Sequence, residues 1–192
     1  RLLIEMAIAR RPMLLILDGP TTALYVTIQA QIVDLIRSIQ KHTRCGMIFV
    51  THDFGLVAEL ADRVYVMYAG QLVEQGSVAD VFSRPLHPYT KGLIECVIPL
   101  GVGANLKTIS GEVPNLRTPP PGCRFSVRCP RATERCSRET PPLENLEDGQ
   151  VRCFFPGFEG ASPATEVLVR SLNKAPAGEP LSATPEHAGL TE

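Results

Sequence analysis

The side chains best suited to chemistry in this chain stand where two short apolar runs end. Asp18 directly follows the run at residues 14–17, and His52 follows the run at residues 47–50 after one threonine. A carboxylate fixed at the end of a strand can support a hydrated Mg²⁺ ion beside phosphate groups. Taken alone, each residue has a structural alternative: Asp18 would cap the next turn, and His52 would be satisfied by local hydrogen bonds.

The elements around these two residues predict a parallel β–α–β unit. Residues 13–17 and 47–50 are unbroken apolar runs, which are typical of strands buried on both faces. Between them we expect a helix with Thr27 as its N-cap, because apolar residues then recur at helical spacing. Such a crossover makes the two strands parallel. Ligands of open parallel sheets bind beyond the carboxyl ends of the strands, so Asp18 and His52 are expected at one edge.

The remaining elements are read from the same patterns. A helix at the start ends at Pro12, residues 54–61 form a short helix, and 63–68 and 71–74 form a hairpin that turns at Ala69-Gly70. A helical turn at 78–82 and a helix at 87–97 follow. From about residue 101 prolines cluster and periodicity disappears. The composition after residue 158 predicts a disordered tail, with a short amphipathic piece at 166–172.

Composition limits the classes of function. The chain has 192 residues, 44% of them apolar, and a net charge of −1, so a packed core is feasible and the charge gives no general case for nucleic-acid binding. It has no apolar run of about 18 residues, the length that a spanning helix needs. We interpret the start at Arg1 as a truncation inside a domain. Six cysteines without a secretory pattern favour a reducing compartment, and metal or free thiols over disulfides.

Four of the cysteines form a late group with the spacing C-x5-C-x6-C-x16-C: Cys123, Cys129, Cys136 and Cys153. Thiolates suit zinc or iron–sulfur clusters, although the tight C-x2-C pairs of a zinc ribbon are missing. A cluster, zinc, and free or disulfide-bonded thiols therefore stay open. The arginines among these cysteines are diluted by acidic residues and have one aromatic neighbour, which predicts a solvated loop and no nucleic-acid partner.

Longer segments carry a resemblance. LLILDGPTTALYVTIQAQIVDLI and IFVTHDFGLVAELADRVYVMYAGQLVEQGSVADVFSRPLHPYTKGLIECV resemble the ATP-binding subunits of ABC transporters. HPYTKGL and PPGCRFSVRCP narrow this resemblance to the oligopeptide/dipeptide importer branch. It covers roughly residues 1–155. It implies an α/β fold: part of a P-loop NTPase domain with a parallel-sheet core at 1–98, a small cysteine-containing domain at 99–156, and the tail at 157–192.

The resemblance also implies roles for the residues singled out above. Asp18 matches the Walker B aspartate that supports Mg²⁺ and ATP, and His52 matches the switch histidine that senses the γ-phosphate. Tyr25, with Leu24, falls in the D-loop at the seam of the ATPase dimer. Some members of this family hold a [4Fe–4S] cluster at the four late cysteines, and we expect zinc there less than a cluster.

The chain departs from the family pattern at several points. Gly19 stands where the family has the glutamate that polarises the attacking water, and Tyr25 stands where the D-loop has an acidic residue. The sequence contains no glycine-rich phosphate loop with its lysine, no glutamine loop and no signature motif. We therefore expect no efficient ATP hydrolysis by this chain alone. A fragment of a longer subunit and a decayed gene product are both compatible with these departures.

The function implied by the resemblance is energy coupling in a peptide importer. Its partners would be a second ATPase subunit, transmembrane permease subunits and, indirectly, a peptide-binding protein. The chain would lie peripherally on the cytoplasmic face of a bacterial plasma membrane. Two alternatives stay open: a non-catalytic regulatory or interaction protein on the same fold, and a metal-binding module built on the cysteines. Nickel import is not separated from peptide import by these motifs.

Overall fold

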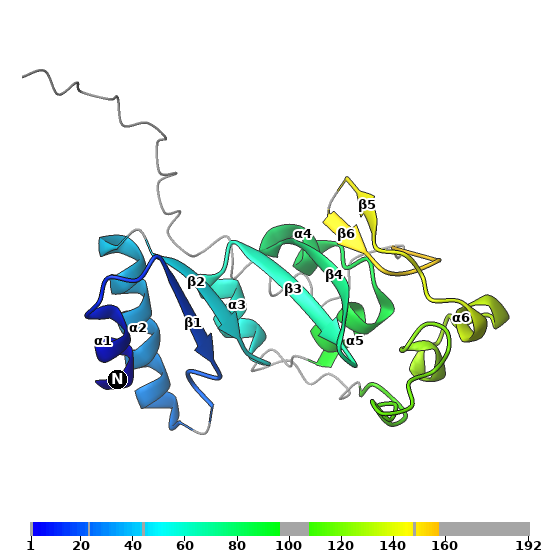
Figure 1. The fold of residues 1–192 in the computed structure, drawn as a ribbon, viewed down its shortest axis with the longest axis horizontal. Coiled ribbons are helices and arrows are strands. Elements are labelled where there is room, and N and C mark those ends of the chain that lie inside the picture. The colour runs from blue at the N-terminus through cyan, green and yellow to red at the C-terminus, as the bar shows by residue number, and fades with distance from the viewer. Residues whose placement is uncertain (1, 23, 44, 97–107, 148, 158–192) are drawn as a thin grey trace, which may run out of the picture.

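The computed structural model describes residues 2–22, 24–43, 45–96, 108–147 and 149–157, which form two sheets and their helices (Figure 1). One sheet pairs β1 (Leu14–Asp18) with β2 (Gly46–Val50). The other has the order β3-β4-β6-β5, from the strands β3 (Arg63–Tyr68), β4 (Gln71–Ser77), β5 (Glu144–Leu146) and β6 (Gly149–Val151). The predicted disordered tail and its amphipathic piece lie outside the described residues.

The first sheet confirms the predicted crossover. β1 and β2 are parallel, with Asp18 opposite Val50, and α2 (Val26–His42) connects them. The predicted N-cap was wrong: Tyr25 holds that position and Thr27 lies inside the first turn. The helix starts earlier because the Tyr25 carbonyl accepts the amides of both Ile28 and Gln29 at 2.9 Å, with no side-chain cap.

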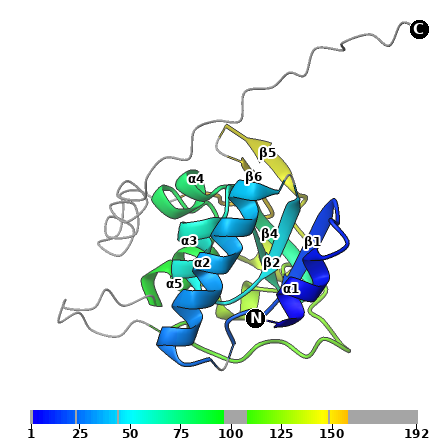
Figure 2. The same ribbon diagram turned by 90° about the vertical axis from the view of Figure 1, so that its left-hand side faces the viewer.

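Three helices cover one face of the β1–β2 sheet (Figure 2). They are α1 (Leu2–Ile8), α2 and α3 (Phe54–Leu60). Their apolar side chains meet those of β1 in a core made of Ile4, Leu15, Leu17, Ile32, Val33, Ile36, Ile39, Leu56 and Leu60. Because Leu15 and Leu17 alternate with outward residues, they are the β1 side chains that this core buries.

The other face of this sheet is open, so the prediction of strands buried on both faces was wrong. Ile16 is 62% exposed and Ile48 48% exposed. The three helices all pack on the opposite side, and no described element covers this face. The unbroken apolar run of 13–17 is thus compatible with a strand that has one covered and one open face.

The second core lies under the antiparallel sheet. The predicted hairpin is confirmed, and Ala69 and Gly70 both have positive φ (47° and 77°), as a type I′ turn requires. α4 (Val78–Ser83) and α5 (Pro88–Cys96) pack beneath it. α3 contributes to both cores, because Leu56 and Leu60 face the first and Phe54 and Val57 face the second.

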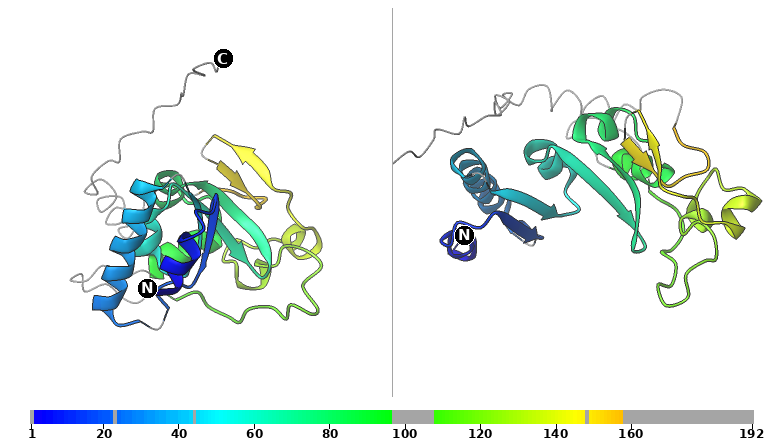
Figure 3. Two further views of the ribbon diagram at one scale, coloured as in Figure 1. Left: turned by 60° about the vertical axis from the view of Figure 1, so that its left-hand side comes forward. Right: turned by 45° about the horizontal axis from the view of Figure 1, so that its top comes forward.

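Regular structure continues where the sequence predicted none. η1 (Ser126–Arg128), α6 (Glu134–Arg138), β5 and β6 all lie after residue 101. β6 pairs with β4 through Glu74–Val151 and Gly76–Gly149. β4 runs on to Ser77 instead of ending at residue 74, because it also pairs there with β3, where Arg63 lies opposite Ser77. This pairing joins the cysteine-bearing segment to the hairpin in one sheet, which two viewing directions show (Figure 3).

Candidate functional site

The edge where β1 and β2 end carries both predicted nucleotide-site residues. Asp18 is the last residue of β1, His52 follows β2 by two positions, and both side chains are exposed. The Gly19 amide donates to the Val50 carbonyl at 2.8 Å, which ties the two strand ends together. The parallel register therefore brings Asp18 and His52 to one edge, as predicted. Their roles toward a nucleotide stay predictions.

Gly19 lies in a tight turn that suits glycine. Its φ is +56°, in the left-handed region, and its carbonyl accepts the Thr22 amide at 3.0 Å. A Cβ built on Gly19 would lie 2.7 Å from the Thr22 Oγ1 atom. A side chain at this position would thus be strained by the positive φ, and the Thr22 side chain would have to rotate away. The predicted role of this position in hydrolysis stays a prediction.

The segment between this turn and α2 exposes an aromatic side chain. Tyr25 is 85% exposed and Leu24 is 39% exposed. Tyr25 makes no side-chain capping bond to α2. Its ring therefore stands in solvent within the described part of the chain, beside the strand-end edge.

A polar pair near this edge was missed by the sequence analysis. The Gln29 amide on α2 donates to the Asp53 Oδ2 atom at 2.8 Å. The Asp53 Oδ1 atom accepts the Leu56 amide at 3.1 Å as the N-cap of α3, and the Asp53 amide donates to the Thr51 Oγ1 atom at 3.0 Å. An aspartate just before an apolar helical segment is an N-cap signal that would have located Asp53. No sequence signal indicated its partner Gln29.

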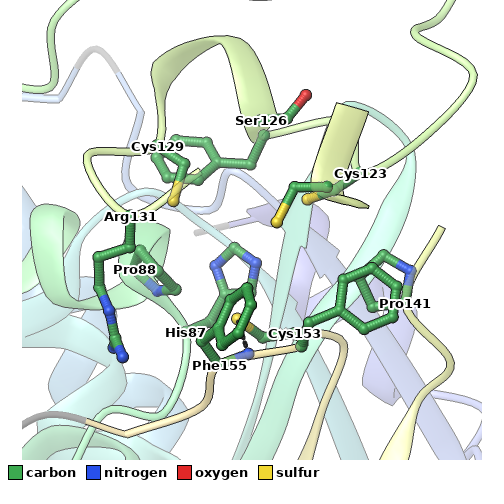
Figure 4. Close-up of a pocket in the computed structure, with 12 residues that line it drawn as sticks. His87, Pro88, Cys123, Ser126, Cys129, Arg131, Pro141, Cys153 and Phe155 are labelled. Carbon is green, nitrogen blue, oxygen red and sulfur yellow. Dashed lines mark hydrogen bonds between the residues drawn. The ribbon is translucent and has the colours of Figure 1, made fainter. Parts of the chain in front are cut away.

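The four late cysteines meet at one pocket. Cys123, Cys129, Cys136 and Cys153 all line it, together with His87 and Phe125. Figure 4 shows Cys123 and Cys129 above the imidazole of His87, with Cys153 below them. The four cysteines come from three segments: Cys123 and Cys129 flank η1, Cys136 lies in α6, and Cys153 follows β6. The first and the last are 30 residues apart in the sequence.

Backbone hydrogen bonds build the wall of this pocket. The Cys123 amide donates to the Cys136 carbonyl at 2.8 Å, and the Ser126 amide donates to the Cys123 carbonyl at 3.0 Å. Gly122 is required beside this contact, because a Cβ there would overlap the Cys136 carbonyl oxygen. This hydrogen bond joins the turn at 122–126 to α6.

The electrostatics of the pocket favour neutral thiols. Burial raises the pKa of Cys123 and of Cys129, and it raises the pKa of the Cys153 thiol to about 11. Metals bind thiolates, so each of these groups must lose a proton at a cost before it ligates.

The cysteine side chains as placed do not fit a metal or a cluster. Within the described ranges, no group of three or more histidine, cysteine or acidic side chains is arranged to hold a metal ion. The four thiols share a pocket without presenting a ligand set. The expectation of a [4Fe–4S] cluster or zinc thus gains no support from this geometry, and the cysteines stay a predicted metal site.

A buried carboxylate binds the start of the HPYT segment beside this pocket through hydrogen bonds. Glu74 is fully buried in β4 and accepts the amides of Leu86 and His87 at 2.7 and 2.8 Å. The His87 Nδ1 atom accepts the Tyr89 amide at 3.0 Å, and burial lowers the pKa of His87 to about 4. Burial also raises the pKa of Glu74, against the opposing effect of its hydrogen bonds. No role for His87 was predicted from the sequence.

Among the described helices, none combines the length and the apolar character that crossing a bilayer requires.

Comparison with known proteins adds sequence likeness to this geometry. Residues 73–136 match a family model described as the C-terminal region of oligopeptide/dipeptide transporters. The dipeptide transport ATP-binding protein DppD of Haemophilus influenzae is 46% identical over 164 residues, which are 85% of this chain and 50% of that protein. The oligopeptide transport ATP-binding protein OppD of Salmonella typhimurium is 48% identical over 158 residues (81% and 47%). For DppD of Bacillus subtilis the identity is 51% over 157 residues (81% and 47%). The chain spans about half the length of these relatives.

Proposed function

The chain belongs to the family of ATP-binding proteins of oligopeptide and dipeptide ABC transporters, and we propose that it forms the Mg²⁺-facing part of an ATP site in a peptide importer. The observation that carries the proposal is the shared edge of the parallel β1–β2 pair, where Asp18 and His52 stand. The half of the relatives that this chain does not span would supply the phosphate loop.

Two side chains would act on the nucleotide in this proposal. The Asp18 carboxylate supports the hydrated Mg²⁺ ion beside the phosphates. The His52 imidazole contacts the γ-phosphate. Gly19 has no side chain to accept a proton from the attacking water, so we expect binding of Mg²⁺ and ATP without efficient hydrolysis.

The assembly proposed for the chain follows its family. Leu24 and Tyr25 would face a second ATPase subunit, since both are exposed beside the strand-end edge. Transmembrane permease subunits would receive the motion of this dimer, and a peptide-binding protein would act indirectly. The chain would then lie peripherally at the cytoplasmic face of the membrane.

A hybrid protein tests this proposal. The half of Haemophilus influenzae DppD that this chain does not match is fused ahead of it, and binding of a fluorescent ATP analogue is measured with and without Mg²⁺. We expect Mg²⁺-dependent binding that Asp18→Asn removes, with phosphate release at background. Hydrolysis is expected to appear in a variant with Gly19→Glu and Tyr25→Asp. A folded hybrid that binds no nucleotide contradicts the proposal.

One alternative is a non-catalytic interaction protein, which Gly19 and Tyr25 favour. In that case the hybrid would bind the permease subunits of the relative while Gly19→Glu with Tyr25→Asp leaves phosphate release at background. Co-purification with the permease, measured beside phosphate release, separates this alternative from the proposal.

The other alternative is a metal-binding module, which the gathering of four cysteines in one pocket favours. The arrangement of the thiols as placed argues against it. Anaerobic purification followed by iron, sulfide and zinc analysis decides the question. Stoichiometric metal that is lost in Cys136→Ser would establish the module, and metal-free protein would exclude it.

A further inference from the structure

We propose that Gln29 is a positioning residue for His52: the hydrogen bond from its amide to Asp53 holds the loop of His52 against the start of α2. This inference rests on the proposed role of His52 toward the nucleotide. Gln29 stands one turn into α2, just after the segment from Asp18 to Tyr25. Asp53 directly follows His52. Their bond thus joins the two loops that leave the same sheet edge.

Asp53 uses both carboxylate oxygens in different ways. Oδ1 accepts the Leu56 amide within its own helix, and Oδ2 accepts the Gln29 amide from the neighbouring helix. The first bond caps α3 whatever the position of α2. The second is a hydrogen bond to an ionised group in a partly buried place, which is stronger than a bond between neutral groups. Only the second can fix the loop of His52 relative to the Asp18 side.

The helices α2 and α3 have further links, but these lie away from the edge. The Gln40 amide donates to the Leu60 carbonyl at 3.2 Å, and Arg37 pairs with Glu59 at 2.7 Å. Both links involve the second half of α2 and the end of α3. In the described part of the chain, the bond between Gln29 and Asp53 is the side-chain link at the His52 end of this pair of helices.

The test reads the His52 ring directly. The ¹H–¹³C signal of its imidazole is recorded by NMR in the full 192-residue chain, and His52→Gln assigns it. Gln29→Glu places a carboxylate against Asp53 and should move or broaden the signal. Gln29→Ala removes the bond without adding charge and should change the signal in the same way. Thermal unfolding of each variant confirms that it is folded.

Restoration separates positioning from general stability. Asp53→Asn keeps an oxygen for the cap of α3, and in Gln29→Glu with Asp53→Asn the donor and acceptor exchange places. This double variant should return the His52 signal toward that of the parent chain. Gln40→Glu is the matched control, because it disturbs the same pair of helices at the far end, and it should leave His52 unchanged.

Several results would overturn the inference. An unchanged His52 signal in both Gln29 variants would do so, as would no restoration in the double variant or an equal change in Gln40→Glu. The measurement contains no nucleotide, so it is independent of the hybrid. A hybrid without nucleotide binding, beside the expected NMR pattern, would reject the proposed function and leave the positioning by Gln29 in place.

Discussion

Gly19→Ala tests whether the strand-end turn has the backbone described here. Gly19 has φ of +56°. An L-residue in this region costs about 1–2 kcal/mol relative to its ordinary conformations. The smaller conformational freedom of the unfolded alanine chain returns roughly 0.4–1 kcal/mol. We therefore expect a net loss of about 1 kcal/mol in the free energy of unfolding, before any contact is counted.

The contact with Thr22 adds a separable part. The new Cβ would lie 2.7 Å from the Thr22 Oγ1 atom, and Thr22 is an exposed residue whose side chain can rotate away. Combining Gly19→Ala with Thr22→Ala removes this contact and leaves the cost of the positive φ. We expect Gly19→Ala to lower the free energy of unfolding by less in the Thr22→Ala background than in the parent chain. The part of the loss that remains is the cost of the positive φ.

Urea unfolding followed by circular dichroism measures these differences, with Gly46→Ala as the matched control. Gly46 begins β2 without a positive φ, and a Cβ there would make only ordinary contacts, 3.5 Å from the Met13 carbonyl oxygen. Gly46→Ala should be neutral or slightly stabilising. If Gly19→Ala is as stable as Gly46→Ala, the turn does not have the left-handed backbone and the reasoning on the missing glutamate fails.

Three further changes have defined outcomes. Asp53→Ala removes the cap of α3 and should cost about 1 kcal/mol by urea unfolding, with Asp53→Asn costing much less. Burial lowers the pKa of His87 to about 4, below its value in the unfolded chain. The contribution of the neutral imidazole to the free energy of unfolding is therefore complete above pH 6.5 and is lost as the pH falls toward 4. The metal-free parent chain should therefore lose roughly 3 kcal/mol relative to His87→Asn across that window, and parallel pH curves would contradict this. Gly122→Ala should destabilise by about 1–3 kcal/mol, whereas Gly157→Ala, whose Cβ meets nothing, should lack this packing cost in thermal unfolding.

The sequence was most informative where the hydrophobic repeat and the geometry of the connecting segment predict the same arrangement. The crossover between residues 13 and 50 was predictable, because two apolar runs flank a helical repeat and such a connection forces parallel strands. The convergence of Asp18 and His52 followed from that alone. The hairpin at Ala69-Gly70 was predictable from its turn residue and flanking β-formers.

Other features depend on partners that no local pattern reveals. The open face of β1 was missed because an unbroken apolar run looks the same whether one or two faces are covered. β5 and β6 are three-residue strands, too short for an alternating pattern, and β6 exists because β4 offers an edge. The bond between Gln29 and Asp53 spans 24 residues, and the bond that the Glu74 carboxylate accepts from the His87 amide spans 13. Such pairings are set by packing and not by composition.

The most direct test of the account is the affinity of the hybrid protein for Mg²⁺ and ATP, measured with Gly19 in place. We expect Mg²⁺-dependent binding that Asp18→Asn removes, accompanied by phosphate release no faster than the background. Binding that is indifferent to Mg²⁺ and to Asp18 would contradict the assignment of this edge as an ATP site. Rapid hydrolysis with Gly19 unchanged would contradict the claim that this position leaves the site without its base.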